Sequence, residues 1–274
     1  MNIAVLGPDG SYSTIAAKKY VEENNIDGTL LYQKTIYDLF ELVKEEKAEM
    51  AIIPLENSLA GTIVETLDRI NYSDLKIKDE IIIPINHCLI TLNDTQSINK
   101  IISHPQAIAQ CSDFLHKNYP DAELQNTLST SEAISKLKEN NMLNTAAIAR
   151  EEFTEDNSLK IVDKNIEDNE LNMTRFVVIS KQGNSEIENP KTTVVIIPNK
   201  DMPGLLYSLL GNFSNRNINL TKIESRPSRF KMGEYIFFVD FIGSAGDDNV
   251  KECLESMKTK ADVKILGTYE NKIK

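Results

Sequence analysis

The first half of the chain alternates short apolar runs with polar turns and amphipathic stretches. The apolar run Asn2–Leu6 is typical of a buried strand, and the segment from about Thr14 to Asn24 has the spacing of an amphipathic helix. Further strands are expected at about 50–53, 101–102, 124–128 and 146–149, and further helices at about 59–70, 107–117 and 131–140. Strands that alternate with helices predict an α/β fold with a largely parallel sheet covered on both faces.

A long apolar run at 80–92 predicts a strand that leaves the first sheet for a second strand–helix set. The runs Leu159–Val162 and Phe176–Ile179 would then bring the chain back. We therefore expect two lobes joined by a double crossover, with a cleft between them. Lobe one would comprise about 1–80 and 160–182, and lobe two about 81–159. In such folds ligands bind at the carboxyl ends of strands, near helix N-termini.

A polar linker at 181–190 ends in a proline, as is typical of a domain boundary. The patterns after it predict strand, helix, strand, strand, helix and strand over residues 192–271. This order is the ferredoxin-like βαββαβ arrangement. Such a unit has a sheet edge that a second copy can pair with, so we expect a homodimer or a homotetramer.

The charge balance argues against nucleic acid or an anionic membrane surface as a partner. Lysine and arginine number 30 against 41 acidic residues, which gives a net charge of -11. No secretory signal is recognised, and no apolar run approaches the roughly 20 residues of a membrane span. Three scattered cysteines and three scattered histidines favour neither a disulfide framework nor a metal site. We expect a cytoplasmic protein without a cofactor.

A polar loop runs into a buried strand at residues 169–180, and Thr174 and Arg175 stand where the loop becomes strand. A hydroxyl and a guanidinium on a rigid element could hold an anion and act on a neighbouring oxygen. The alternative is that both side chains are simply solvated. The turns before the helices could bind carboxylates with free N–H groups, or they could serve only as caps, as the capping box at 129–132 indicates.

Five segments occur in an order that carries more information than any one of them. They are Gly7-Pro8-x-Gly10-Ser11-Tyr12-Ser13, Pro54-Leu55-Glu56-Asn57-Ser58-x-x-Gly61, Ser103-His104-Pro105-Gln106-Ala107-x-Ala109-Gln110-Cys111, Ser129-Thr130-x-Glu132-Ala133 and Asn172-x-Thr174-Arg175-Phe176. Together they closely resemble prephenate dehydratase. Asp201-x-Pro203-Gly204-Leu205 and Glu224-Ser225-Arg226-Pro227 resemble the ACT regulatory domain. The resemblance implies a two-lobed, periplasmic-binding-protein-like catalytic domain over 1–182 and an ACT domain over 192–271.

The resemblance also implies a reaction, the decarboxylating dehydration of prephenate to phenylpyruvate in L-phenylalanine biosynthesis. Aromatisation drives this reaction, so no metal or organic cofactor is needed. Thr174 matches the threonine associated with catalysis, and we expect it to hydrogen-bond the leaving hydroxyl. Arg175 is the preferred partner of a substrate carboxylate, or it pairs with a loop acid. Glu56 could be a proton source if burial raised its pKa, or it could cap its turn.

Polar side chains on the remaining motif turns are expected to contact the substrate. With one aromatic residue, these are Ser11, Ser13, Asn57, Ser58, His104, Gln106, Ser129, Thr130, Asn172 and Phe176. His104 could be the acid or could pack or cap at a helix start. Phe176 would wall the pocket or belong to the core. His87 and His116 are taken as structural.

In similar enzymes phenylalanine binds between paired ACT domains. The effector residues expected on that basis are Asp201, Pro203, Gly204, Leu205, Leu206, Glu224, Ser225, Arg226 and Pro227. The usual Gly-Ala-Leu-Val of the family reads Gly204-Leu205-Leu206-Tyr207, so bulkier side chains would reshape the pocket. The alternative for Arg226 is an exposed charge that follows a strand.

Two rival functions remain open from the sequence. Arogenate dehydratase acts on a substrate that differs only in an amino group replacing the keto oxygen. A noncatalytic two-lobed sensor of amino or aromatic acids would share the cleft architecture, since fold alone does not imply activity.

Overall fold

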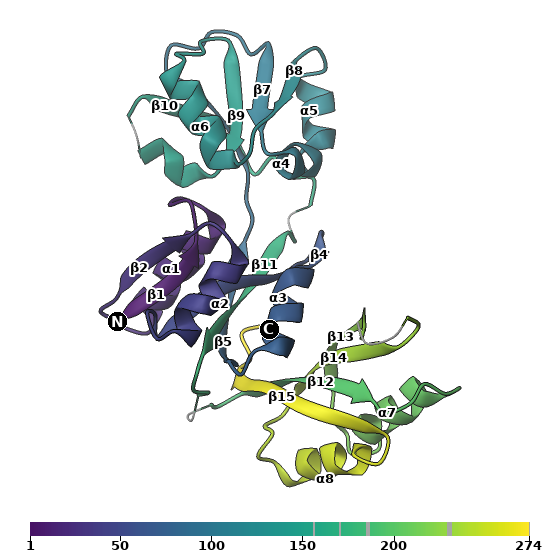
Figure 1. Ribbon diagram of the computed structural model, residues 1–274. Coiled ribbons are helices and arrows are strands. Elements are labelled where there is room, and N and C mark those ends of the chain that lie inside the picture. Colours follow the sequence, from purple (N-terminus) through teal and green to yellow (C-terminus); the bar gives the residue numbers. More distant parts are fainter. Residues whose placement is uncertain (156, 170, 185–186, 229–231, 274) are drawn as a thin grey trace.

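The chain folds into two α/β lobes and a third α/β unit, stacked one after another in Figure 1. The computed structural model describes residues 1–155, 157–169, 171–184, 187–228 and 232–273. Each unit has its own sheet with helices against it. The expected two-lobed α/β architecture with a ferredoxin-like third unit is confirmed.

The sheet of the first lobe has the strand order β2-β1-β3-β11-β5, with β4 paired to β3. Its strands are β1 (Asn2–Leu6), β2 (Thr29–Gln33), β3 (Met50–Asn57), β4 (Gly61–Thr62), β5 (Lys76–Pro84) and β11 (Met173–Ser180). Helix α1 (Tyr12–Glu23) packs on one face, while α2 (Ile36–Lys44) and α3 (Val64–Tyr72) pack on the other. Strand β11 runs antiparallel to both β3 and β5, so the sheet is mixed, and the expectation of a largely parallel sheet is wrong.

The sheet of the second lobe has the order β10-β6-β9-β7-β8. Its strands are β6 (Cys88–Leu92), β7 (Lys100–Ser103), β8 (Glu123–Asn126), β9 (Thr145–Ala149) and β10 (Leu159–Lys164). Helix α6 (Thr130–Glu139) packs on one face, and α4 (Pro105–Gln110) and α5 (Ser112–Asn118) on the other, while the 3-10 helix η1 (Glu151–Glu155) precedes β10. The expected return to lobe one from residue 160 is therefore wrong. Leu159 and Ile161 pack in the core of lobe two, and only β11 returns.

Some elements differ from the sequence-based expectations. Strand β2 and helix α2 were not anticipated, although Ile36, Leu39, Phe40 and Val43 have clear helical spacing and are buried. The single helix expected at 107–117 is divided into α4 and α5 at Cys111. The expected helix at 59–70 begins only at Val64, because the short strand β4 precedes it.

The third unit has the strand order β13-β14-β12-β15, which is the βαββαβ arrangement expected of an ACT domain. Its elements are β12 (Pro190–Pro198), α7 (Leu205–Ser214), β13 (Leu220–Pro227), β14 (Tyr235–Ile242), α8 (Asp248–Met257) and β15 (Ala261–Glu270). Helices α7 and α8 cover one face of this sheet. The linker expected at 181–190 includes Ser185 and Glu186, which lie outside the described residues.

The other face of the ACT sheet packs against the first lobe (Figure 1). Val195, Phe238 and Leu266 of the ACT sheet belong to the same buried cluster as Phe40 and Ile77 of the first lobe. The two units therefore share one hydrophobic core, whose burial holds them together.

Strands β5 and β15 approach one another very closely at Gly267. A Cβ atom built on Gly267 would lie only 2.1 Å from the carbonyl oxygen of Ile77. The absence of a side chain at this position allows the ACT sheet to touch the backbone of the first lobe.

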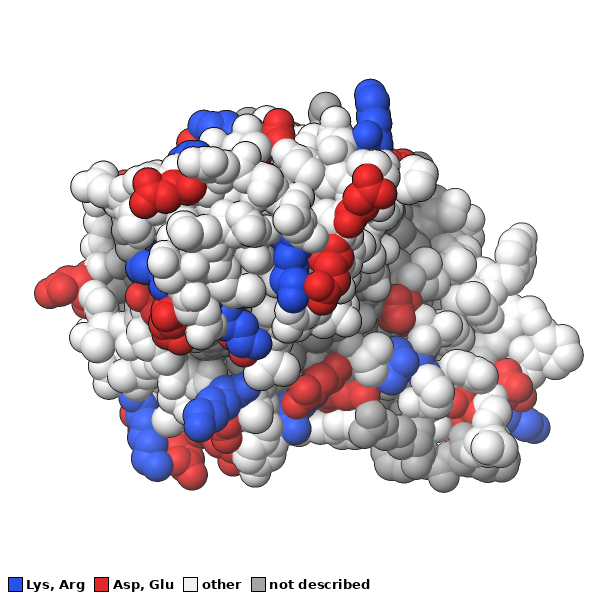
Figure 2. Space-filling model, turned by 90° about the horizontal axis from the view of Figure 1, so that it is seen from above, with Lys and Arg blue, Asp and Glu red and all other residues white. Residues whose placement is uncertain are grey.

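Charges of both signs are interspersed over the face seen in Figure 2, which looks down on the molecule from the side of the second lobe. Among the described residues, no helix has the length and apolar character needed to cross a membrane.

Candidate functional site

A cavity of about 470 Å³ is lined by residues from both lobes. Seven residues that the sequence assigned to substrate or catalysis line it: Ser11, Asn57, His104, Gln106, Ser129, Thr130 and Thr174. The first lobe contributes the start of α1, the β3–β4 hairpin and β11, and the second lobe contributes the starts of α4 and α6. The motif turns that are far apart in the sequence thus meet at one site.

Asn57 holds the hydroxyl of Thr174 from behind. The Asn57 side-chain amide donates to Oγ1 of Thr174 at 3.0 Å and to Oδ1 of Asn172 at 2.8 Å. The side-chain oxygen Oδ1 of Asn57 accepts from the backbone N–H groups of Leu59 and Ala60 at 3.1 and 2.8 Å, which fixes the orientation of the side-chain amide. Because Oγ1 of Thr174 accepts this bond, its own hydrogen is left to donate into the cavity.

Ser58 and Asn172 support this arrangement without lining the cavity. The Ser58 hydroxyl donates to the carbonyl of Leu171 and accepts from the backbone N–H of Met173. Asn172 is buried and accepts from Asn57. Both residues fix the strand that carries Thr174, so the geometry assigns them support in place of the expected substrate contact.

Of the helix N-termini that face the cavity, those of α1 and α6 are capped by serine hydroxyls, one in each lobe. The Ser11 hydroxyl caps α1 by accepting from the N–H of Thr14, and the Ser129 hydroxyl caps α6 by accepting from the N–H of Glu132. The other N–H groups of each first turn remain available, and the helix dipole adds partial positive charge. No Lys, Arg, Asp or Glu is among the described residues that line the cavity, so the groups that its lining offers to an anion are these helix termini and neutral polar side chains.

His104 faces the cavity from the start of α4. Its Nδ1 accepts from the backbone N–H of Gln106 at 3.2 Å, so it caps the helix. In the neutral ring this bond places the proton on Nε2 and makes that nitrogen a donor.

Among the cavity residues that sequence reasoning did not assign are His87 and Tyr12. His87, taken as structural, lines the cavity from the segment that joins the lobes, and its Nε2 lies 3.0 Å from Oε1 of Gln110. Burial lowers the pKa of His87, with Gln110 and Glu167 opposing this shift. Tyr12 donates to the carbonyl of Asn86 at 2.8 Å. The apolar character of the adjoining 81–85 run gave no signal that His87 would face a cavity.

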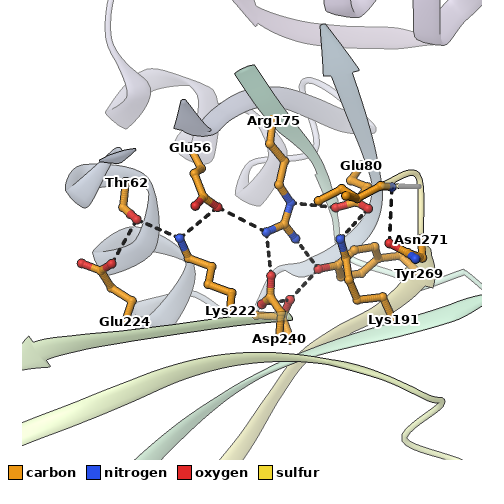
Figure 3. A network of polar contacts seen from close by, with 12 residues as sticks. Glu56, Thr62, Glu80, Arg175, Lys191, Lys222, Glu224, Asp240, Tyr269 and Asn271 are labelled. Carbon is orange, nitrogen blue, oxygen red and sulfur yellow. Dashed lines mark hydrogen bonds and ion pairs between the residues drawn. The ribbon is translucent and has the colours of Figure 1, made fainter. Parts of the chain in front are cut away.

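Arg175 and Glu56 do not line the cavity, which corrects the roles expected for them. Successive side chains of a strand point to opposite faces, so Thr174 and Asn57 face the cavity while Arg175 and Glu56 face the ACT sheet. The Arg175 guanidinium binds Glu80 at 2.7 Å and Asp240 at 2.6 Å (Figure 3). Arg175 is therefore paired with protein carboxylates and is not free to bind a substrate carboxylate.

The environment of Arg175 is a buried network that joins the two domains. Its side chain is 6% exposed, and it also donates to the hydroxyl of Tyr269 at 2.7 Å. Glu80 accepts in addition from Lys191 at 2.6 Å. Burial alone would lower the pKa of Arg175, but Tyr269, Asp240 and Glu80 together raise it well above its usual value. The guanidinium is thus charged at every accessible pH.

Glu56 has a similar position. It binds Lys222 of the ACT sheet at 2.9 Å and lies 3.7 Å from Arg175. It therefore neither caps its turn nor reaches the cavity as a proton source. Ser13 is buried within α1, and Phe176 belongs to the core beside α1. Neither residue lines the cavity, although both were expected to contact the substrate.

Models of two known protein families match the chain. A family model described as prephenate dehydratase matches residues 3–184, and one described as the ACT domain matches residues 193–258. The chain belongs to the prephenate dehydratase family. A prephenate dehydratase of Methanocaldococcus jannaschii is 38% identical over 275 residues, which cover 98% of each protein.

Solved structures of prephenate dehydratases superpose on most of the chain. One from Arthrobacter aurescens, in complex with L-Phe, has a TM-score of 0.88 at 30% identity and covers 99% of this chain and 90% of its own. Another from Staphylococcus aureus has a TM-score of 0.86 at 31% identity and covers 98% of this chain and all of its own.

The segments expected to bind an effector divide into two groups in this prephenate dehydratase family member. Asp201 and Leu205 line a small cavity of about 100 Å³ in the ACT domain. Glu224 and Arg226 instead point toward the first lobe, where the carboxylate of Glu224 accepts from Thr62 at 3.2 Å and Arg226 lies 3.6 Å from Asp68. Arg226 is thus not a free surface charge.

The two bulkier residues that depart from the family motif lie on different faces of α7. Leu205 is buried in the ACT core, whereas Tyr207 is 84% exposed. The residues Pro203, Gly204, Leu206, Ser225 and Pro227 are not among those that line the small cavity.

Proposed function

We propose that the chain is a prephenate dehydratase, which converts prephenate to phenylpyruvate in phenylalanine biosynthesis. The observation that carries this proposal is the Thr174 hydroxyl, held by Asn57 with its hydrogen free, between two opposed helix N-termini. This arrangement suits a dianion whose hydroxyl must depart.

The two carboxylates of prephenate match the two capped helices. Free N–H groups at the start of α1 and α6 bind one carboxylate in each lobe, so the substrate bridges the cleft. This leaves Thr174 to donate a hydrogen bond to the ring hydroxyl. His104, with Nε2 carrying its proton, is a second donor from the opposite lobe.

The reaction consumes one proton, which is ultimately drawn from solvent, and needs no other reagent. The bond from the ring to its carboxylate breaks and carbon dioxide departs, and the electron pair moves into the ring. The bond to the hydroxyl breaks in turn, and the oxygen leaves as water after it gains a proton. The protein orients the dianion, stabilises the departing oxygen and excludes bulk water.

The test is turnover of prephenate by the purified chain, followed by the absorbance of phenylpyruvate in alkali. Thr174→Val should lower kcat by about 100-fold or more, while Thr174→Ser, which keeps the hydroxyl, should retain most of it. Substrate binding without turnover by the wild-type chain would favour the noncatalytic sensor. Competition between prephenate and arogenate decides which of the two is the substrate.

We assign regulation by L-phenylalanine to the ACT domain, over residues 192–271, and catalysis to residues 1–182. Support comes from the motif residues at the small ACT cavity and from the L-Phe that accompanies the Arthrobacter aurescens relative. A second copy would pair through β13, whose outer edge is unpaired among the described strands. The free, buried cysteines suit a reducing cytoplasm.

A further inference from the structure

The ACT sheet reaches the back of the wall that forms the substrate cavity. Lys222 of β13 donates to Oγ1 of Thr62 at 2.8 Å and binds Glu56 at 2.9 Å, as Figure 3 shows. The hydroxyl of Thr62 in turn donates to Glu224 at 3.2 Å. One lysine and one glutamate of β13 thus hold the β3–β4 hairpin, which spans residues 50–62.

The same hairpin carries cavity residues on its other face. Asn57, Gly61 and Thr62 line the substrate cavity, and Asn57 holds Thr174. The register pairs Glu56 with Thr62 and Asn57 with Gly61, so a shift of Glu56 moves Asn57 directly. The contact with β13 is therefore one residue away from the catalytic hydroxyl's partner.

The ACT end of this connection lies beside the effector motif. Lys222 and Glu224 alternate with Ile223 on β13, so both point to the first lobe, and Glu224 is the first residue of the 224–227 motif. Lys222 is 10% exposed, so its charge is largely removed from water. A buried charge that loses its partner is costly, so the pair moves as a unit when β13 moves.

We propose that Lys222 is the positioning residue that transmits ligand binding at the 224–227 effector motif to the substrate cavity. Displacement of β13 shifts Glu56 and Thr62, and with them Asn57 and the Thr174 hydroxyl. This inference rests on the proposed function and names the connection between its two sites. By linkage, if bound phenylalanine changes the affinity for the substrate by some factor, bound substrate must change the affinity for phenylalanine by the same factor.

The test compares Lys222→Met with Lys264→Met in the full-length chain. Lys264 also joins the ACT sheet to the first lobe, since it donates to the carbonyls of Asn71 and Ser73 at 2.6 and 2.8 Å. These acceptors lie at the far end of α3 and outside the cavity lining. The control therefore removes an inter-domain lysine without touching the hairpin.

In the wild type and in Lys264→Met, saturating phenylalanine should weaken prephenate binding, measured as a rise in KM, by a factor of about 5–150, the usual range of such coupling. In Lys222→Met the factor should fall below about 2, while calorimetry shows phenylalanine binding unchanged. A wild-type factor in Lys222→Met overturns the inference. So does loss of phenylalanine binding in that variant, because Lys222 would then belong to the effector site itself.

Amide hydrogen exchange gives a second readout that does not depend on turnover. Phenylalanine should alter exchange of residues 57–63 in the wild type and in Lys264→Met, but not in Lys222→Met. An unchanged hairpin in the wild type overturns the inference. If prephenate is not turned over but the hairpin responds to phenylalanine, the proposed reaction fails and the connection stands.

Discussion

At the scale of single residues, His87 makes the stability of the folded chain depend on pH. It is buried where the lobes join, and burial lowers its pKa below the usual 6.5. At a pH between the lowered pKa of His87 in the folded chain and its higher pKa in the unfolded chain, the unfolded chain binds the extra proton. Stability from this residue is thus complete above about pH 6.5 and declines as pH falls through that range.

Replacement of His87 by glutamine removes this titration while keeping a hydrogen-bonding partner for Gln110. The wild type should lose more stability than His87→Gln between pH 7 and pH 5, measured as the midpoint of urea unfolding. Above pH 7 the two curves should run parallel, with only a constant difference in stability between them. Parallel curves over the whole range would show that His87 does not contribute to the pH dependence.

The sequence could predict which residues gather at the site, but not every direction in which they point. Thr174 and Asn57 were assigned from motifs and do line the cavity. Their neighbours Arg175 and Glu56 were assigned with them, although strand alternation sends adjacent side chains to opposite faces. What the sequence could not provide was the presence of an ACT sheet on the reverse face, where Asp240 satisfies the guanidinium.

At the scale of elements, the cap of α6 has both a structural and a functional role. Ser129 caps α6 and lines the cavity, whereas Thr35 caps α2 away from it. Both Ser129→Ala and Thr35→Ala should lower the free energy of unfolding by about 1 kcal/mol. Only Ser129→Ala should also raise KM for prephenate, because only that helix terminus is expected to bind a carboxylate. An equal KM in the two variants would show that the α6 terminus does not bind a substrate carboxylate.

The contact between β5 and β15 depends on the missing side chain at Gly267. Gly267→Ala places a methyl group against the Ile77 carbonyl, so it should cost about 1–3 kcal/mol or more in stability. The matched change Gly211→Ala lies within α7, where the new methyl group meets nothing within 4 Å beyond its chain neighbours and the adjoining helix backbone. It should stabilise the chain by up to about 1 kcal/mol. Thermal unfolding of both variants measures the difference.

The elements themselves were largely accessible from hydrophobic periodicity. The six ACT elements and most strands of the lobes follow from runs such as 235–241 and 50–53, because a two-residue or helical repeat is local information. The assignment of β10 to the second lobe was not accessible. Its pairing with β6 joins segments some seventy residues apart, and such pairing leaves no local trace in either segment.

At the scale of the whole molecule, the Arg175 network makes domain docking sensitive to single charges. Arg175→Met leaves Glu80 and Asp240 buried with one partner fewer each, which should cost about 3–5 kcal/mol. The comparison is Arg69→Met, which removes a half-exposed i,i+4 pair with Glu65 and should cost about 1 kcal/mol or less. Urea unfolding measures both, and equal losses would mean that the network contributes no more than a surface pair.

The core shared by the first lobe and the ACT sheet has a consequence for how such enzymes can be recombined. Recombination of two related genes within the 181–190 segment would exchange the entire ACT domain between the two proteins. The chimera would inherit Ile77 from one parent and its facing glycine from the other, and likewise Arg175 and Asp240. Functional hybrids should therefore come from parents with matching residues at these facing positions, whatever the overall identity of the two sequences.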